Sequence, residues 1–419
     1  MKKILFFSYY WPPSGRASLH LPLKIIQHLP SFGWQPTVVT IDEDTFSQKD
    51  ESLLKEVPEN LKVIKTKVFE PFNLYRSFLG KEKNAALISS ETISKENKGL
   101  RHRLAIWIRM NLFIPDARIG WYPYAVKEVK KILKQEKFDA IISIGPPHTT
   151  HLIAKKTSRL SGLPHIPVFI DPWVDIVYYS GFKRSKLTLA IDNHFEKSVL
   201  RNSAAAVFVT ASMQDDYIKK YPWLKEKSHV LYWGYNEENF TSVPEIKKEG
   251  DEKVLMHAGN IFDYQNPVNL WKRIKAETAR RNKFRLKFVG TVSPAIKKAI
   301  TESGLDGITD YAGFLPYSEM IKEIMNADYL LVCATEKRHV PGKLFEYLRS
   351  CKPILAYGND NDEIANILRN ANAGILLNYN DDGDKFFENA KSYKTDLNYV
   401  RTFDRKNIAG ALAGIANSL

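Results

Sequence analysis

The chain has 419 residues, a formal net charge of +14, 44% hydrophobic residues and 12% aromatic residues. This length predicts two to three domains, and the composition excludes disordered and fibrous proteins. The two cysteines, Cys333 and Cys351, are too few for a disulfide framework, and both are expected to be buried thiols. The basic excess favours an anionic partner, namely a nucleotide, a membrane surface or nucleic acid, unless it serves solubility alone. No apolar run of about 18 residues occurs, so we expect no transmembrane helix.

Apolar and amphipathic segments alternate along the first half of the chain. The pattern predicts strands at 3–10, 35–41, 61–68, 138–144, 166–170, 205–210 and 230–233. Helices are predicted between them at 15–29, 123–135, 148–160, 187–201 and 213–221. A polar stretch at 237–252 then predicts a linker.

A second alternating series begins at residue 253. Strands are predicted at 254–258, 285–289, 308–311, 329–333, 354–357 and 374–377, and helices at 267–281, 294–303, 318–326, 342–350 and 362–370. Two such series predict an α/β protein with two doubly wound parallel-sheet domains, 1–236 and 253–400. We expect them to face each other across a ligand-binding cleft, with the segment 401–419 crossing back to the first domain.

The stretch 336–358 predicts an anion site between two apolar strands. Pro341 suits the first position of a helix, and the amides of Gly342 and Lys343 would point out of that helix start. Lys343 adds a positive charge, and Glu346, one turn later, can accept hydrogen bonds from two vicinal hydroxyls. A diphosphate joined to a ribose fits this pattern. The alternative is a capped core helix with a solvated Lys343–Glu346 pair.

The first strand is followed by a turn with one glycine, Gly15, at the expected helix entrance. The G-x-G-x-x-G fingerprint is absent, which argues against a nicotinamide or flavin enzyme. The turn can still bring backbone amides near a phosphate.

Several loops, in order, resemble glycosyltransferase family 4, the nucleotide-sugar-dependent enzymes of the GT-B fold. The matching segments are FFSYYWPPSG, GPPHTTHLIA, DPWVD, NSAAAVFVTASMQDDY, VLYWGYN, HAGNIFDYQNP, FVGTVS, GFLPYSEMIKEIMNADYLLV and PGKLFEYLRSCKPILA. The resemblance implies two facing Rossmann-like domains, with the donor bound mainly by the second and the acceptor by the first. It also implies a retaining transferase that needs no metal and no other cofactor, since the nucleotide sugar is a co-substrate.

The resemblance assigns Glu346 to the donor ribose and the amides of Gly342 and Lys343 to the phosphates. A second family glutamate is expected eight residues before Glu346, where this chain has Arg338. Some bacterial polysaccharide members share the P-x-K-x-x-E-Y pattern and lack that glutamate. Pro341 and Arg338 are therefore kept among the donor-binding candidates.

A second departure follows the first strand of the second series. The family often has an arginine after Gly259 and a lysine about six residues further on, but this chain has Asn260 and Asn266. Lys343 and Arg338 are the candidates to supply the missing positive charge.

The resemblance places His148 near the donor sugar. Asp171, at a predicted strand end before Pro172 and Trp173, is expected to be an acceptor-side carboxylate. His148, Asp171 and Lys343 are the candidate catalytic residues, and no nucleophile is assigned. The alternatives are that His148 caps a helix or packs in the core, and that Asp171 caps the next turn. His148 and His151 form an H-x-x-H pair, but no third zinc ligand is evident.

The segment 101–118 interleaves arginines with Trp107, Phe113 and Ile114. This favours an anionic membrane surface, although an ordinary helix with solvated arginines has the same pattern. Nucleic acid is not expected, because no recognition motif occurs.

We therefore expect a cytoplasmic, peripherally membrane-bound retaining glycosyltransferase. It would move a sugar from a nucleoside diphosphate, best fitted by UDP, to a glycan or lipid-linked glycan in cell-surface polysaccharide synthesis. The alternative is an inactive nucleotide- or glycan-binding member of an assembly complex.

Overall fold

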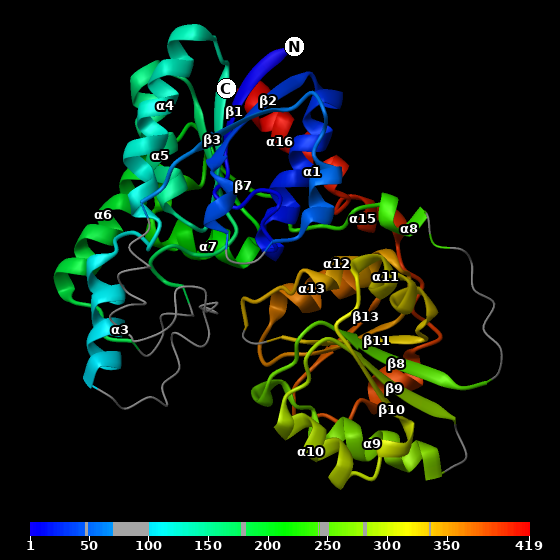
Figure 1. The fold of residues 1–419 in the computed structure, drawn as a ribbon. Coiled ribbons are helices and arrows are strands. Elements are labelled where there is room, and N and C mark those ends of the chain that lie inside the picture. The colour runs from blue at the N-terminus through cyan, green and yellow to red at the C-terminus, as the bar shows by residue number, and fades with distance from the viewer. Residues whose placement is uncertain are drawn as a thin grey trace. The chain divides into compact units, whose positions relative to one another are not determined.

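The computed structural model (Figure 1) divides into two compact units. Unit 1 comprises Met1–Leu231 and Ala409–Leu419, and unit 2 comprises Tyr232–Ile408. The structure describes residues 1–46, 49–69, 100–176, 182–241, 243, 251–279, 283–334 and 337–419. Within the segment expected as a linker, α8 spans Glu238–Thr241, while residues 242 and 244–250 lie outside the described residues.

Unit 1 is built on a parallel sheet, which in the described residues has seven strands in the order β3-β2-β1-β4-β5-β6-β7. The strands are β1 (Lys2–Phe7), β2 (Trp34–Ile41), β3 (Lys62–Thr66), β4 (Ala140–Gly145), β5 (His165–Phe169), β6 (Ala206–Phe208) and β7 (Ser228–Val230). The order reverses between β1 and β4. Ligands of doubly wound folds bind outside the carboxyl ends of strands at such a point.

Helices cover this sheet, namely α1 (His20–His28), α4 (Tyr122–Gln135), α5 (Thr149–Ser161), α6 (Lys186–Asn202) and α7 (Ala211–Lys220). A further helix, α3 (Leu100–Leu112), contacts the start of α6, where Asn111 accepts the Ser185 N–H at 2.6 Å. One core contains Phe7 of β1, Val129 of α4 and Ile153 of α5. Trp121, the residue just before α4, belongs to the same core. The expectation that the first helix starts near residue 15 is wrong, because α1 begins at His20 after a 3-10 turn, Ala17–Leu19. That start places Pro22 in the first turn, where no backbone N–H is needed.

Unit 2 holds a parallel sheet with, in the described residues, six strands in the order β10-β9-β8-β11-β12-β13. The strands are β8 (Lys253–Ala258), β9 (Phe284–Val289), β10 (Thr309–Gly313), β11 (Tyr329–Cys333), β12 (Ile354–Tyr357) and β13 (Gly374–Leu377). The helices are α9 (Val268–Ala279), α10 (Pro294–Glu302), α11 (Tyr317–Asn326), α12 (Lys343–Arg349), α13 (Asp362–Asn370), α14 (Asp384–Asn389) and α15 (Leu397–Arg401). The prediction of two doubly wound α/β domains is confirmed.

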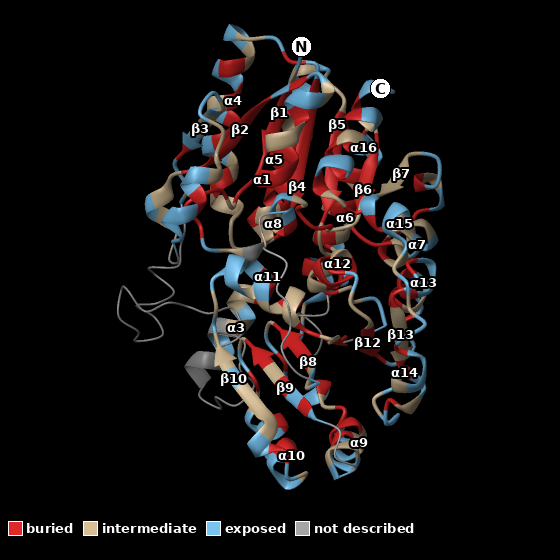
Figure 2. Ribbon diagram, turned by 90° about the vertical axis from the view of Figure 1, so that its right-hand side faces the viewer, coloured by how far each residue is buried: buried red, intermediate tan, exposed pale blue. Residues whose placement is uncertain are grey.

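Each face of the second sheet is covered by its own group of helices. One core contains Ile321, Leu344 and Ile364 from α11, α12 and α13. The core on the other face contains Trp271 of α9 and Ile296 of α10. Figure 2 shows the inner strands β8 and β12 largely buried, whereas the edge strand β10 is mostly of intermediate burial. Both faces of a parallel sheet are typically buried in this way.

The last helix, α16 (Arg405–Asn417), belongs to both units, because its residues from Ala409 onward are part of unit 1. A Cβ on Gly410 would lie 2.8 Å from the Phe32 ring, so this part of α16 packs closely on unit 1. Among the described residues, no helix combines the length and apolarity needed to cross a membrane.

Cys333 is buried, as expected, but the expectation of a buried thiol is wrong for Cys351. Cys351 follows α12 in a turn with φ of 58°. This turn ends the helix and leaves the side chain exposed.

Candidate functional site

Two glycine turns meet at the carboxyl edge of the unit 2 sheet. Gly259 follows β8 with φ of 96°, and Gly290 follows β9 with φ of 111°. A Cβ on Gly290 would lie 2.7 Å from the Gly259 carbonyl, so the close approach requires glycine. Asn260 joins the two turns, since its Oδ1 accepts a hydrogen bond from the Thr291 N–H at 3.2 Å.

The ammonium of Lys343, at the start of α12, lies against the first of these turns. A Cβ on Gly259 would be 3.0 Å from Lys343 Nζ. On its other side Lys343 Nζ is 3.1 Å from His257 Nε2, and His257 Nδ1 is 3.0 Å from the Leu331 carbonyl oxygen. The structure therefore brings Lys343 together with the Gly259–Asn260 turn, two of the loops selected from the sequence.

Burial governs the electrostatics of this cluster. It lowers the pKa of Lys343 to about 8, with the neighbouring Cys333 and Glu346 acting in the opposite direction. Burial, and then the charge of Lys343, hold the pKa of His257 well below its usual value. His257 is thus a neutral imidazole, and Lys343 has no ion-pair partner within the part of the chain that the structure describes.

Glu346 lies on the first turn of α12 and is buried, with 6% of its surface exposed. The Tyr317 hydroxyl donates to its Oε1 at 2.9 Å, and burial raises the pKa of the carboxyl group. One residue on, the Tyr347 hydroxyl accepts the Ala258 N–H at 2.7 Å and fixes α12 to β8. The alternative of a solvated Lys343–Glu346 pair is therefore wrong.

The remaining donor-side candidates differ in exposure. Pro341 is buried, and Gly342 is the N-cap residue of α12. A Cβ on Gly342 would lie 3.0 Å from the Trp233 indole, so only glycine fits there without displacing the ring. Arg338 lies in the preceding turn with its side chain exposed.

In unit 1, His148 precedes α5 and packs face to face on Trp173, with ring centroids 4.8 Å apart and planes 6° apart. Its side chain makes no capping hydrogen bond, so the helix-cap alternative is wrong and the packed-histidine alternative fits the observed stacking. Burial lowers the pKa of His148 to about 3. A hydrogen bond with the Pro172 backbone acts on this pKa in the opposite direction. Asp116 caps α5 instead, accepting the Thr149 N–H at 2.9 Å.

A buried polar chain that the sequence did not predict lies behind His148. The Ser143 hydroxyl bridges His151 Nδ1 and His165 Nε2, at 2.7 Å to each, and all three residues are fully buried. A Cβ on Gly145 would lie 2.5 Å from His151 Nε2 and 3.2 Å from His148 Nδ1, so both nitrogens face the end of β4. No group of three or more metal-ligating side chains occurs in the described residues.

Asp171 and Gly15 are the other candidates in unit 1. Asp171 follows β5, and burial raises the pKa of its carboxyl group to about 6. It caps no turn within the described residues, where the structure gives it no hydrogen bond. Gly15 is exposed in the turn after β1, five residues before α1 begins, so its amide does not lie at the start of that helix.

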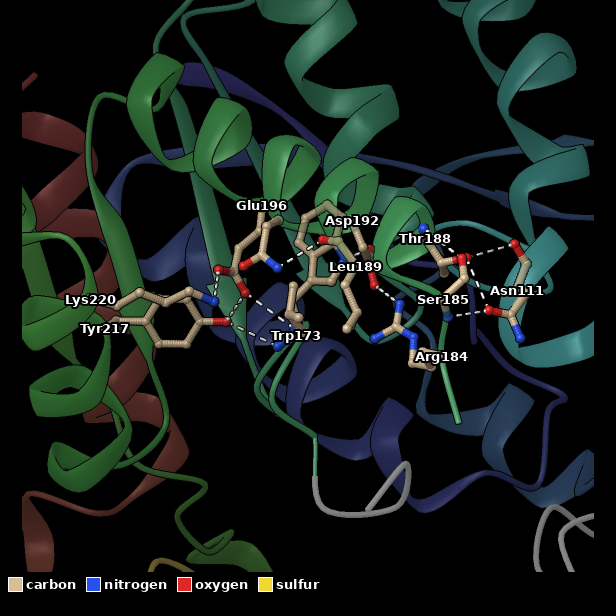
Figure 3. Close-up of polar contacts among 12 residues, drawn as sticks. Asn111, Trp173, Arg184, Ser185, Thr188, Leu189, Asp192, Glu196, Tyr217 and Lys220 are labelled. Atoms are coloured by element: carbon tan, nitrogen blue, oxygen red, sulfur yellow. Dashed lines mark hydrogen bonds and ion pairs between the residues drawn. The ribbon is translucent and has the colours of Figure 1, made fainter. Parts of the chain in front are cut away.

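Two buried acids of α6 fix the loop that carries Asp171 (Figure 3). Asp192 accepts the Trp173 indole N–H at 2.7 Å and pairs with Arg184. Glu196 accepts the Val174 N–H at 3.2 Å and is also bound by Tyr217, Tyr221 and Lys220. These acids hold the 171–175 loop, and with it the ring on which His148 stacks.

The sequence contained one signal for the contacts of Asp192 and Glu196. Their four-residue spacing on a predicted helix places both acids on one face. His257, Ser143 and His165 had a similar signal as polar residues within otherwise apolar strands. Neither signal names a partner, because the partners are distant in the sequence.

The segment 101–118 begins with α3, which has an exposed apolar face. Leu104 is 48%, Trp107 48% and Leu112 62% exposed. Leu104 and Trp107 are three residues apart and therefore neighbours on one side of the helix. Arg103 is also exposed, whereas the side chain of Arg101 lies outside the described residues.

Two doubly wound parallel-sheet units, with candidate residues at the carboxyl ends of strands and at the start of α12, have the architecture of the GT-B fold. Residues 23–239, more than half of the chain, match the profile of Glycosyltransferase Family 4. The chain belongs to this family, as the resemblance predicted.

Similarity to solved structures agrees with this fold. HepE from Anabaena in complex with UDP is 13% identical with a TM-score of 0.63, and the alignment covers 100% of both chains. Sucrose-phosphate synthase from Thermosynechococcus elongatus is 12% identical with a TM-score of 0.59, over 100% of this chain and 99% of that one. The lipopolysaccharide outer core galactosyltransferase WaaB is 14% identical with a TM-score of 0.57, over 100% of both chains. No curated protein matches the chain.

Proposed function

We propose that this protein is a retaining glycosyltransferase that moves a hexose from a UDP-sugar to a glycan or lipid-linked glycan in cell-surface polysaccharide synthesis. The observation that carries the donor assignment is the contact of the partly buried Lys343 ammonium with the Gly259 turn. UDP as the nucleotide is supported by the similarity to HepE, which was crystallised with UDP and with UDP-glucose. The retaining outcome and the polysaccharide role are supported by the family resemblance.

The proposed chemistry follows from the leaving group. Breaking the sugar–phosphate bond leaves negative charge on the diphosphate, and a positioned cation stabilises that charge most where water is excluded. Lys343 is the proposed cation, next to Gly259 and Asn260. Glu346, oriented by Tyr317, is the proposed ligand of the ribose hydroxyls.

The proposal includes no metal ion and no other cofactor, because Lys343 supplies the charge that a divalent cation would otherwise provide. Activity should therefore persist in excess EDTA, and a requirement for added Mg²⁺ or Mn²⁺ would contradict this part of the proposal.

His148 and Asp171 are proposed to act from unit 1. The neutral His148 imidazole is suited to hydrogen-bond a sugar hydroxyl, and Asp171, with its raised pKa, to accept a proton from an acceptor. Gly15, Pro341, Gly342 and Arg338 remain proposed donor contacts.

An anionic membrane surface is the proposed partner of α3, and we place the reaction at the cytoplasmic face of the membrane. The support is the exposure of Leu104, Trp107 and Leu112 on α3, together with the exposed Arg103. Sedimentation with anionic vesicles should weaken when Arg101, Arg103 and Arg109 are changed to glutamine. Unchanged sedimentation would contradict the membrane assignment.

The donor site is tested by calorimetric binding of UDP and by turnover of a panel of UDP-sugars. Lys343→Met and Glu346→Gln should each lower the turnover by about tenfold or more, because each loses an interaction with a charged or hydroxyl-rich part of the donor. Lys322→Met is the matched control, since Lys322 is an exposed lysine of α11 in the same unit. Normal turnover in both site variants would refute the assigned site.

A second candidate function, a catalytically inactive nucleotide- or glycan-binding member of an assembly complex, is favoured by one observation. Asn260 and Asn266, which stand where the family often has basic residues, both have structural partners here. Asn260 accepts the Thr291 N–H at 3.2 Å, and Asn266 accepts the Trp271 indole N–H at 2.7 Å. UDP binding without transfer or hydrolysis of any sugar nucleotide would support this function.

A further inference from the structure

Lys343 contacts His257, the second-last residue of the central strand β8. Its side chain is buried, with 1% of the residue exposed. A carbonyl oxygen only accepts hydrogen bonds, so the 3.0 Å contact with the Leu331 carbonyl requires His257 Nδ1 to carry the proton. Nε2 of the neutral ring is then an acceptor, and it lies 3.1 Å from Lys343 Nζ.

The choice of a neutral acceptor matters for a charged ligand. A buried ammonium needs a hydrogen-bond acceptor, and a carboxylate would meet that need but would cancel the charge. An imidazole accepts the hydrogen bond and leaves the full positive charge. Lys343 has no carboxylate at ion-pair distance within the described residues, which sets it apart from Lys220, paired with Glu196 at 2.7 Å.

We propose that His257 is a positioning residue of the transfer reaction, an inference that rests on the proposed function. His257 holds the Lys343 ammonium against the Gly259 turn and leaves the charge of Lys343 available to the diphosphate. The contact on the other side of Lys343 supports this. A Cβ on Gly259 would approach Nζ to 3.0 Å, so the ammonium is confined between the imidazole and the backbone turn.

Four titratable groups act on Lys343 from the elements packed around it. They are His257 of β8, Cys333 of β11, Glu346 of α12 and His339 of the preceding loop. Burial and the nearby Lys343 charge lower the pKa of His339 to about 4, and burial raises the pKa of Cys333 to about 12. Near neutral pH, His257, His339 and Cys333 are therefore uncharged, and the first of these is hydrogen-bonded to Lys343.

The test measures the protonation of Lys343 directly. Competitive labelling with acetic anhydride, followed by mass spectrometry of the peptide that carries Lys343, gives the pH at which the amine becomes reactive. His257→Phe keeps a ring and removes the acceptor, so the labelling midpoint should fall by about one pH unit or more. His257→Gln, whose side-chain oxygen can accept from Lys343, should restore most of the midpoint.

His165→Phe is the matched control, because it removes an equally buried imidazole from unit 1. Its Lys343 midpoint should equal that of the wild type, while thermal unfolding reports any general loss of stability. An unchanged midpoint in folded His257→Phe would overturn the inference. If that variant does not fold, His257→Glu provides the test. Because its carboxylate neutralises Lys343, the labelling midpoint of Lys343 should rise and the UDP dissociation constant should increase by about tenfold. A midpoint or an affinity that stays constant there also overturns it.

Titration of the wild type with UDP separates the two levels of the proposal. Absence of UDP binding would refute the proposed function and, with it, the role of His257 in transfer. UDP binding with a midpoint insensitive to His257 would refute only the positioning role.

Discussion

Replacing Glu196 with alanine should strongly destabilise unit 1, because its carboxylate closes a buried polar network (Figure 3). Glu196 is fully buried. It accepts hydrogen bonds from the hydroxyls of Tyr217 and Tyr221, each at 2.9 Å, and from the Val174 N–H at 3.2 Å. Lys220 Nζ lies 2.7 Å from the same carboxylate.

The expected magnitude follows from what the substitution leaves behind. Glu196→Ala strands two buried hydroxyls and one backbone N–H, and an unsatisfied buried donor costs about 1–3 kcal/mol. Lys220 keeps a second partner, Asp175, at 3.0 Å and can turn toward water, so its contribution is small. Allowing for local relaxation around these three donors, we expect a loss of about 3–5 kcal/mol in the free energy of unfolding. Glu196→Gln keeps the size and one acceptor and should lose about half as much.

Urea unfolding followed by tryptophan fluorescence measures this loss, since Trp173 lies in the loop held by Glu196. Glu226→Ala is the matched control, an exposed glutamate of the same unit that should change the free energy by less than about 0.5 kcal/mol. A loss below about 1 kcal/mol for Glu196→Ala would show that water or other side chains replace the carboxylate, and would refute this prediction.

Three further predictions concern the candidate sites. Lys343→Met should raise the free energy of unfolding by up to about 3 kcal/mol at pH 7 while weakening UDP binding, because burial has lowered the lysine pKa from 10.5 to about 8. The cost of burying the charged lysine is fully present below pH 8 and fades as the pH rises to about 10.5. The stability gained by Lys343→Met should therefore vanish near pH 10.5 in urea titrations. Asp171→Asn should also stabilise, by up to about 3 kcal/mol at pH 7.5, because its folded pKa is raised from 3.8 to about 6. The gain should disappear near pH 4, and a gain independent of pH would contradict the assigned cause. Gly259→Ala should cost about 1–3 kcal/mol for its positive φ and should also weaken UDP binding in calorimetry, since the methyl group meets Lys343. Gly33→Ala has a similar φ, 82°, and no neighbour within 4 Å of its Cβ, so it should lose stability and leave UDP binding unchanged.

The fold was predictable because its signals are local. Apolar strands such as 329–333 and 354–357 are continuous, and amphipathic helices separate them, so the alternation alone predicts two parallel sheets. The error at α1 has a local cause too: Ser14 and Gly15 have the composition of a helix start, but Pro22 fixes the first turn further along. The exposed thiol of Cys351 was missed because a left-handed residue after a helix has no signal in an apolar pattern.

The candidate sites were predictable only in part. Lys343 and Glu346 could be selected because their spacing on one short helix suggests a chemistry. Their partners, His257 and Tyr317, lie 86 and 29 residues away, and no pattern in one sequence connects such positions. The same holds for Ser143, which links two histidines by contacts that exist only after β4, β5 and α5 have packed together.

The division of α16 between the two units has a consequence for biosynthesis. Unit 1 buries Ala409, Leu412, Ala413 and Ala416, and Asn417 accepts a hydrogen bond from Lys2 at 3.1 Å. These residues leave the ribosome after all of unit 2 has been translated, so the first unit to be made is completed last. During translation its nascent sheet must wait, with the apolar surface around Phe32 uncovered, while some 177 residues of unit 2 emerge. A fragment ending at Leu231 would remain in that incomplete state and should depend on chaperones for its solubility.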